Sequence, residues 1–164
     1  MNKLSSRFLI AAAALFYSIT VAAASPTPSI VDAAQKYLAA YSTFDMEKMA
    51  PLISDDMVFT DPTKPPETNG GEPFVYAGKD AVLAALGGYA KLYKEFSLDY
   101  DIQRYFESNG AVIFVGDITY NILTDDQQTL TGTAPIVTII TVKDGKIVEH
   151  RDYYDYAGNA VNAN

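Results

Sequence analysis

The second half of the chain consists of four long segments with the composition of β-strands, separated by short turn sequences. The segments are rich in β-branched and aromatic residues and cover 98–106, 111–123, 129–142 and 146–154. Between them stand Ser108-Asn109-Gly110, Thr124 to Gln128 and Lys143-Asp144-Gly145, which are typical of turns between antiparallel strands. We therefore expect an antiparallel meander, and the length of its last three strands favours a strongly curved sheet.

The first half favours helices. The expected elements, in chain order, are a helix over 29–41, a short helix over 46–53, a strand over 57–60, a long loop over 62–77 and a helix over about 78–96. Ser29 and Asp45 are the expected N-caps of the first two helices. Gly87-Gly88 inside the last helix predicts close packing or a kink. Helices followed by a meander predict an α+β fold, a cone-shaped curved antiparallel sheet wrapped on the N-terminal helices and enclosing a pocket.

The N-terminus has the pattern of a cleavable export signal. Lys3 and Arg7 precede an apolar run over 8–21, and Ala22-Ala23-Ala24 gives the small residues that a signal peptidase needs. The alternative is a retained membrane anchor, but the run is shorter than the about 20 residues that span a bilayer. We expect residues 1–24 to be a signal peptide, 25–164 to be one domain, and the protein to be secreted or periplasmic.

The composition limits the classes of partner that the protein can bind. The formal net charge is −8, and loss of Lys3 and Arg7 with the signal peptide would make it −10. Such an acidic surface argues against nucleic acid and, after signal removal, against membranes, but it is compatible with a neutral or cationic small molecule. The chain has no Cys and one His, and it shows neither a metal-ligand motif nor a glycine-rich nucleotide motif. We therefore expect no cofactor and no metal.

Asp61 is the first candidate for acid–base chemistry. It ends a strand, and Pro62 holds it extended at the entrance to the long loop. A carboxylate beside apolar walls is a usable general base, whereas the plain alternative is an Asp that only makes a turn. Tyr37 lies on the expected inner stripe of the first helix. Its hydroxyl would donate to a developing oxyanion, or its ring would simply pack in the core.

The last strand supplies a second pair of candidates. Strand alternation places His150 and Asp152 on one face together with Val148, about 7 Å apart along the strand. If that face is the inner one, the two side chains interact in the cavity. The alternative is a solvated His beside a surface Asp.

Asp117 is a further candidate. It is in phase with Ile113 and Val115, so the pattern predicts a carboxylate on an apolar face. The alternative is an edge Asp near a bulge at Gly116.

The first half resembles the bacterial ketosteroid isomerases. The resemblance lies in Gln35-Lys36-Tyr37-Leu38-Ala39-Ala40, Asp45-Met46, Ser54-Asp55-Asp56, Asp61-Pro62 and Gly78-Lys79-Asp80-Ala81. It implies that Tyr37 is an oxyanion donor and that Asp61 shuttles a proton. In Thr133-Ala134-Pro135-Ile136-Val137, Val137 stands where that family carries a protonated Asp.

The closing strand resembles a second branch of the same nuclear transport factor 2-like superfamily. The run 151–155, Arg-Asp-Tyr-Tyr-Asp, is similar to that of limonene-1,2-epoxide hydrolases and SnoaL-like polyketide cyclases, which implies an acid–base role for Asp152. The hydrolases also carry Arg-x-Asp on a middle strand. Here Asp117 matches the Asp, and Val115 replaces the Arg.

Together the residues and the resemblance predict an exported SnoaL-like protein with a pocket for a small hydrophobic molecule. The expected activity is that of a cofactor-independent isomerase, cyclase or epoxide hydrolase, with Asp61, Tyr37, Asp152, His150 and Asp117 as site residues. The alternatives are a non-catalytic ligand-binding module and an accessory protein that forms a homodimer through its exposed sheet face.

Overall fold

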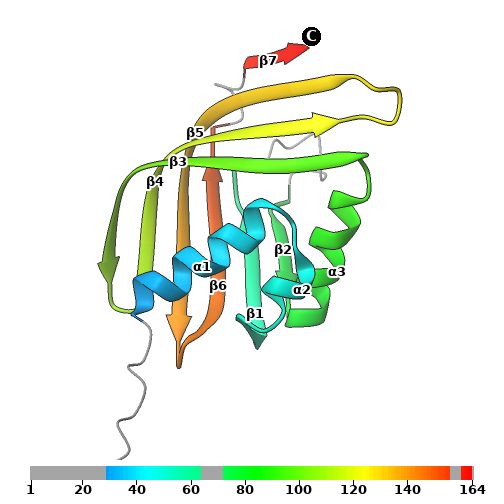
Figure 1. The fold of residues 1–164 in the computed structure, drawn as a ribbon. Helices are drawn as coiled ribbons and strands as arrows, with labels where there is room; N and C mark the ends of the chain where they lie inside the picture. The colour runs from blue at the N-terminus through cyan, green and yellow to red at the C-terminus, as the bar shows by residue number, and fades with distance from the viewer. Residues whose placement is uncertain (1–28, 64–71, 156–159, 164) are drawn as a thin grey trace, which may run out of the picture.

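The computed structural model describes residues 29–63, 72–155 and 160–163, in which helices come first and a large sheet follows (Figure 1). The helices are α1 (Ile30–Ser42), α2 (Met46–Met49) and α3 (Lys79–Ala90), and the strands are β1 (Ile53–Asp61), β2 (Phe74–Ala77), β3 (Glu95–Ser108), β4 (Ala111–Leu123), β5 (Thr129–Lys143), β6 (Lys146–Tyr154) and β7 (Ala160–Ala163). This order confirms the predicted α+β class. The predicted signal peptide and residues 64–71 of the predicted loop lie outside the described residues.

The strands form one curved, unclosed sheet in the order β2-β1-β6-β5-β4-β3, with β7 paired to β5. Neighbours are antiparallel except β1 and β6, which run parallel. Figure 1 shows the long strands β3, β4 and β5 bending sharply, so that the sheet curls over α1. This is the cone-like arrangement that the strand lengths predicted.

The concave face of the sheet holds the core. Along β4, Val112, Phe114 and Ile118 are buried, while the alternate residues are only partly covered. Tyr37, Leu38 and other apolar residues of α1 pack onto that face. The buried face of the strands, which repeats every two residues, and the buried face of α1, which repeats every 3.6 residues, therefore pack against each other in one core.

Both predicted N-caps are present. The Ser29 hydroxyl accepts a hydrogen bond from the Asp32 backbone N–H at 3.0 Å, and the Asp32 carboxylate accepts one from the Ser29 N–H at 3.3 Å. This is a reciprocal capping box, and Asp45 caps α2 by accepting from the N–H of Lys48 at 3.0 Å. These caps fix where α1 and α2 begin beside the sheet.

Several predicted bounds are wrong, including those of the first strand, which runs over Ile53–Asp61 rather than 57–60. The second helix ends at Met49 rather than 53, because Pro51 cannot continue a helix. The third helix ends at Ala90, and Phe96 belongs to β3, where it pairs with Ile122. The predicted loop contains β2, which pairs antiparallel with β1.

Within the described residues, no helix reaches the length and apolarity that crossing a membrane requires.

Candidate functional site: an aromatic cavity with two carboxylates

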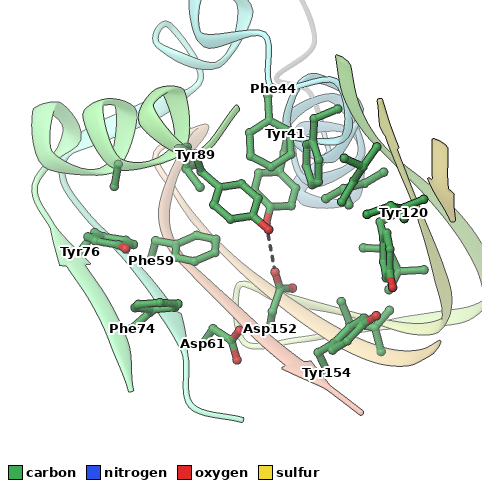
Figure 2. Close-up of a pocket in the computed structure, with 18 residues that line it drawn as sticks. Tyr41, Phe44, Phe59, Asp61, Phe74, Tyr76, Tyr89, Tyr120, Asp152 and Tyr154 are labelled. Carbon is green, nitrogen blue, oxygen red and sulfur yellow. Dashed lines mark hydrogen bonds between the residues drawn. The ribbon is translucent and has the colours of Figure 1, made fainter. Parts of the chain in front are cut away.

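A cavity of about 440 Å³ opens between the concave face of the sheet and helices α1 and α3 (Figure 2). Its described lining residues are aromatic (Tyr41, Phe44, Phe59, Phe74, Tyr76, Tyr89, Phe96, Tyr120 and Tyr154), aliphatic (Ala85, Leu86, Leu98, Ile118, Ile122, Leu130 and Ile136) or acidic (Asp61 and Asp152). No Lys, Arg or His is among these lining residues. The described walls are therefore mostly hydrocarbon, and the two charged residues among the described lining are carboxylates.

The two carboxylates come from neighbouring strands. In the parallel ladder between β1 and β6, Phe59 pairs with His150 and Thr60 with Arg151. The next position on each strand is Asp61 and Asp152, and neighbouring strands lie about 4.8 Å apart. Figure 2 shows both side chains on the same wall of the cavity. The strand register thus brings together two residues that are far apart in sequence.

Asp61 ends β1 on that wall and is 8% exposed. Its Oδ1 accepts hydrogen bonds from the backbone N–H and the hydroxyl of Thr63, at 3.1 and 2.9 Å. The Thr63 hydroxyl in turn accepts from the N–H of Tyr154 at 2.8 Å, which ties the end of β1 to β6. These bonds hold the Asp61 carboxylate in a defined position.

Asp152 is surrounded by donors. Its Oδ1 accepts from the Thr138 hydroxyl at 2.6 Å, and its Oδ2 accepts from the Tyr41 hydroxyl at 3.3 Å. The Nε2 atom of His150 lies 2.9 Å from Oδ1, although it is not aligned as a hydrogen bond. A carboxylate that accepts from fixed groups on α1 and β5 cannot turn away from the cavity.

His150 lies behind Asp152, fully buried and away from the cavity surface. Its Nδ1 is 2.9 Å from the Tyr37 hydroxyl. Rings of Tyr41 and Phe59 meet it edge to face, with centroids 4.6 and 4.8 Å away. Tyr37, His150 and Asp152 therefore form a buried chain that reaches the cavity only at Asp152.

The buried tyrosines are proton donors. Burial first, and then the negative charge of Asp152, raises the pKa of Tyr37, Tyr41 and Tyr100 well above its ordinary value. Burial, followed by the neighbouring Tyr120 and Asp155, raises the pKa of Tyr154 to about 12. At neutral pH these hydroxyls stay protonated, and those of Tyr41 and Tyr154 belong to cavity-lining residues.

The structure brings together four of the five residues that the sequence singled out, but not in the expected way. Asp61 and Asp152 line the cavity, whereas Tyr37 and His150 lie behind it. The helix tyrosine that reaches the cavity is Tyr41, one turn after Tyr37.

Asp117 does not join them. It projects from the outer face of β4, and its Oδ2 accepts a hydrogen bond from Gln103 Nε2 at 2.9 Å. A register shift in β3 lies opposite Gly116, so the alternative of an Asp near a bulge describes the structure. The prediction of a buried carboxylate failed because Ile113 and Val115 face outward with Asp117.

Val137 also faces outward, paired with Val115 and with Tyr153, which is 40% exposed. It therefore does not occupy a cavity position. The inward neighbour is Thr138, which the sequence reasoning missed together with Tyr41. Both were detectable in principle, because Tyr41 follows Tyr37 by four residues and Thr138 pairs with Asp152 across the expected hairpin.

Within residues 29–63, 72–155 and 160–163, no group of three or more His, Cys, Asp or Glu side chains is placed to hold a metal ion.

Residues 34–150 match the family model of the SnoaL-like domain. Because this match covers most of the chain, the protein belongs to the SnoaL-like family, within the nuclear transport factor 2-like fold. Among curated proteins, none matches the chain significantly.

Solved structures share the fold. A candidate SnoaL-like polyketide cyclase from Shewanella putrefaciens superposes with a TM-score of 0.66 at 20% identity, covering 80% of this chain and 82% of its own. An epoxide hydrolase from Mycobacterium tuberculosis, similar to limonene epoxide hydrolase, gives 0.57 at 19%, covering 79% and 84%. A Catenulispora acidiphila protein with a ketosteroid isomerase-like fold, solved with trimethylamine, gives 0.57 at 15%, covering 81% and 90%. At these identities the likeness establishes the fold.

Proposed function

We propose that this SnoaL-like protein is an acid–base enzyme that acts on a small hydrophobic molecule, and that the Asp61 and Asp152 carboxylates are its functional groups. The observation that carries the proposal is the position of these two groups side by side on the wall of an otherwise apolar cavity. Such a wall excludes water and strengthens each electrostatic interaction with a bound molecule. The chemistry needs no cofactor.

In this proposal Asp61 is the general base. Its carboxylate is fixed by Thr63 at the end of β1 and faces the cavity (Figure 2). A positioned base accelerates proton removal by about 100-fold or more. Asp152 is the second carboxylate, held by Thr138 and Tyr41 and supported from behind by His150 and Tyr37.

Tyr41 takes the donor role that the resemblance implied for Tyr37. Its hydroxyl belongs to a cavity-lining residue and keeps its proton at neutral pH, so it can donate to a developing oxyanion when that bond replaces its 3.3 Å hydrogen bond to Asp152. The reaction class is proton transfer next to a carbonyl, or the related isomerisation, cyclisation or epoxide opening that a carboxylate pair also supports.

Two probe reactions test the proposal without knowledge of the natural substrate. Nitrobenzisoxazole reports a carboxylate base, because removal of its C–H proton breaks the N–O bond and releases a coloured phenolate. Styrene oxide reports epoxide opening by water. We expect the wild-type protein to turn over at least one probe faster than acetate at the same pH, and Asp61→Asn to reduce that rate by about 100-fold.

Asp117→Asn is the matched control, because it removes the same charge from the outer face of the same sheet. It should leave the rate unchanged. An unchanged rate in Asp61→Asn would remove Asp61 from the mechanism. Probe binding without turnover in the wild-type protein would favour the alternative of a non-catalytic binding module.

A further inference from the structure

Asp152 is a buried carboxylate whose described partners are all neutral donors or an imidazole. Its side chain is 9% exposed, and it contacts the hydroxyls of Thr138 and Tyr41 and the Nε2 atom of His150. A buried charge is stable when a group of opposite charge balances it. None of the described Lys or Arg residues forms an ion pair with Asp152 or lines the cavity.

His150 is the basic side chain nearest to Asp152, and its Nε2 atom lies 2.9 Å from Oδ1 without the alignment of a hydrogen bond. Tyr37 keeps its proton, because burial raises its pKa, and its hydroxyl is therefore able to donate to Nδ1. If the hydroxyl donates, Nδ1 is the acceptor and the proton of a neutral imidazole sits on Nε2, which faces Asp152 Oδ1. In that tautomer His150 adds no positive charge beside Asp152, and none of the described Lys or Arg side chains lines the cavity to supply one.

The walls around Asp152 favour a cation as well. Figure 2 shows the carboxylate between the rings of Phe59, Tyr41 and Tyr154, with Asp61 beside it. Aromatic faces attract a positive charge through their quadrupoles, and the attraction is stronger in a desolvated site. An anionic molecule would instead meet two carboxylates and no described cationic side chain on the walls.

We propose that the ligand itself supplies the cation: a compact, largely hydrocarbon molecule with a protonated amine that pairs with Asp152. This inference rests on the proposed function. It leaves proton transfer to Asp61 and gives Asp152 the task of holding the positive end of the substrate. The hydrocarbon part then fills the aromatic remainder of the cavity, and carboxylic acids and phosphates are excluded as ligands.

Three probes with one ring system and different charges test the inference by calorimetry at neutral pH. Naphthylmethylamine is a cation, naphthylmethanol is neutral, and naphthoic acid is an anion. We expect the amine to bind the wild-type protein about tenfold or more tightly than the alcohol, and the acid to bind most weakly. An alcohol that binds as tightly as the amine would overturn the inference, whatever the variants show.

Asp152→Asn should lower the affinity for the amine to that for the alcohol, while the affinity for the alcohol stays unchanged. Asp117→Asn, on the outer face, should retain the full preference and so excludes an effect of net charge alone. A preference for the amine that survives in Asp152→Asn would contradict the assignment of Asp152. The calorimetry measures binding without turnover. A failure of this inference is therefore distinguishable from a failure of the acid–base proposal, which would appear as an inactive wild type or an active Asp61→Asn.

Discussion

Two tyrosines one helical turn apart on α1 have different tasks. Tyr41 reaches the cavity and donates to Asp152, whereas Tyr37 forms a hydrogen bond with His150 behind it. The sequence identified the correct face of α1 but not which of its tyrosines lines the cavity. That depends on how far along the helix the sheet curls over it, and periodicity alone does not contain this information.

At the scale of single residues, Tyr37→Phe tests the buried chain. The change leaves the Nδ1 atom of His150 buried without its hydrogen-bond partner, so we expect the free energy of unfolding to fall by about 1–3 kcal/mol. Urea denaturation measures it. Tyr105→Phe, at a residue that is 49% exposed, is the control and should change stability by less than about 0.5 kcal/mol. Equal stabilities of the two variants would mean that the bond to His150 contributes nothing.

At the scale of elements, the turns made the strands predictable. The bounds predicted for β4 and β6 agree with the structure, because Asn109-Gly110 and Asp144-Gly145 adopt the positive φ angles that such hairpin turns require. The pairing of the strands was harder to predict from the sequence. The parallel contact of β1 with β6 places Asp61 next to Asp152, and it joins residues about 90 positions apart that no local signal connects.

The helix α3 offers a test at the same scale. It runs through Gly87 and Gly88, and a Cβ atom at Gly88 would meet nothing within 4 Å. Because alanine restricts the unfolded chain and favours helix, we expect Gly88→Ala to raise the melting temperature and to stabilise the protein by up to about 1 kcal/mol. A loss of stability would indicate the kink that the glycine pair predicted.

For the whole molecule, three buried tyrosines around Asp152 link stability to alkaline pH. The pKa of Tyr37, Tyr41 and Tyr100 is raised in the folded protein, so above the ordinary tyrosine pKa of about 10 the unfolded chain loses these protons first. Stability is then fully present below that pH and falls as pH rises beyond it, by up to about 1.4 kcal/mol per pH unit for each group. Unfolding in urea at increasing pH measures the slope, and Tyr37→Phe should reduce it. A flat profile would contradict the burial of these hydroxyls.

The position of the protein in the cell is also a property of the whole chain. We propose that residues 1–24 direct export and are removed, so that the mature protein begins at Ser25. Mass spectrometry of protein recovered from the bacterial periplasm or medium gives the mature N-terminus. Recovery of the chain from the cytoplasm with Met1 still attached would contradict the proposal.

We propose that Asp61 removes a proton from a molecule bound in the aromatic cavity. The most direct measurement is exchange of the α-protons of β-tetralone for deuterium in heavy water, followed by proton NMR. We expect faster exchange with the wild-type protein than with buffer alone, and a loss of about 100-fold or more in Asp61→Asn but not in Asp117→Asn. Exchange at the same rate in wild type and Asp61→Asn would contradict it.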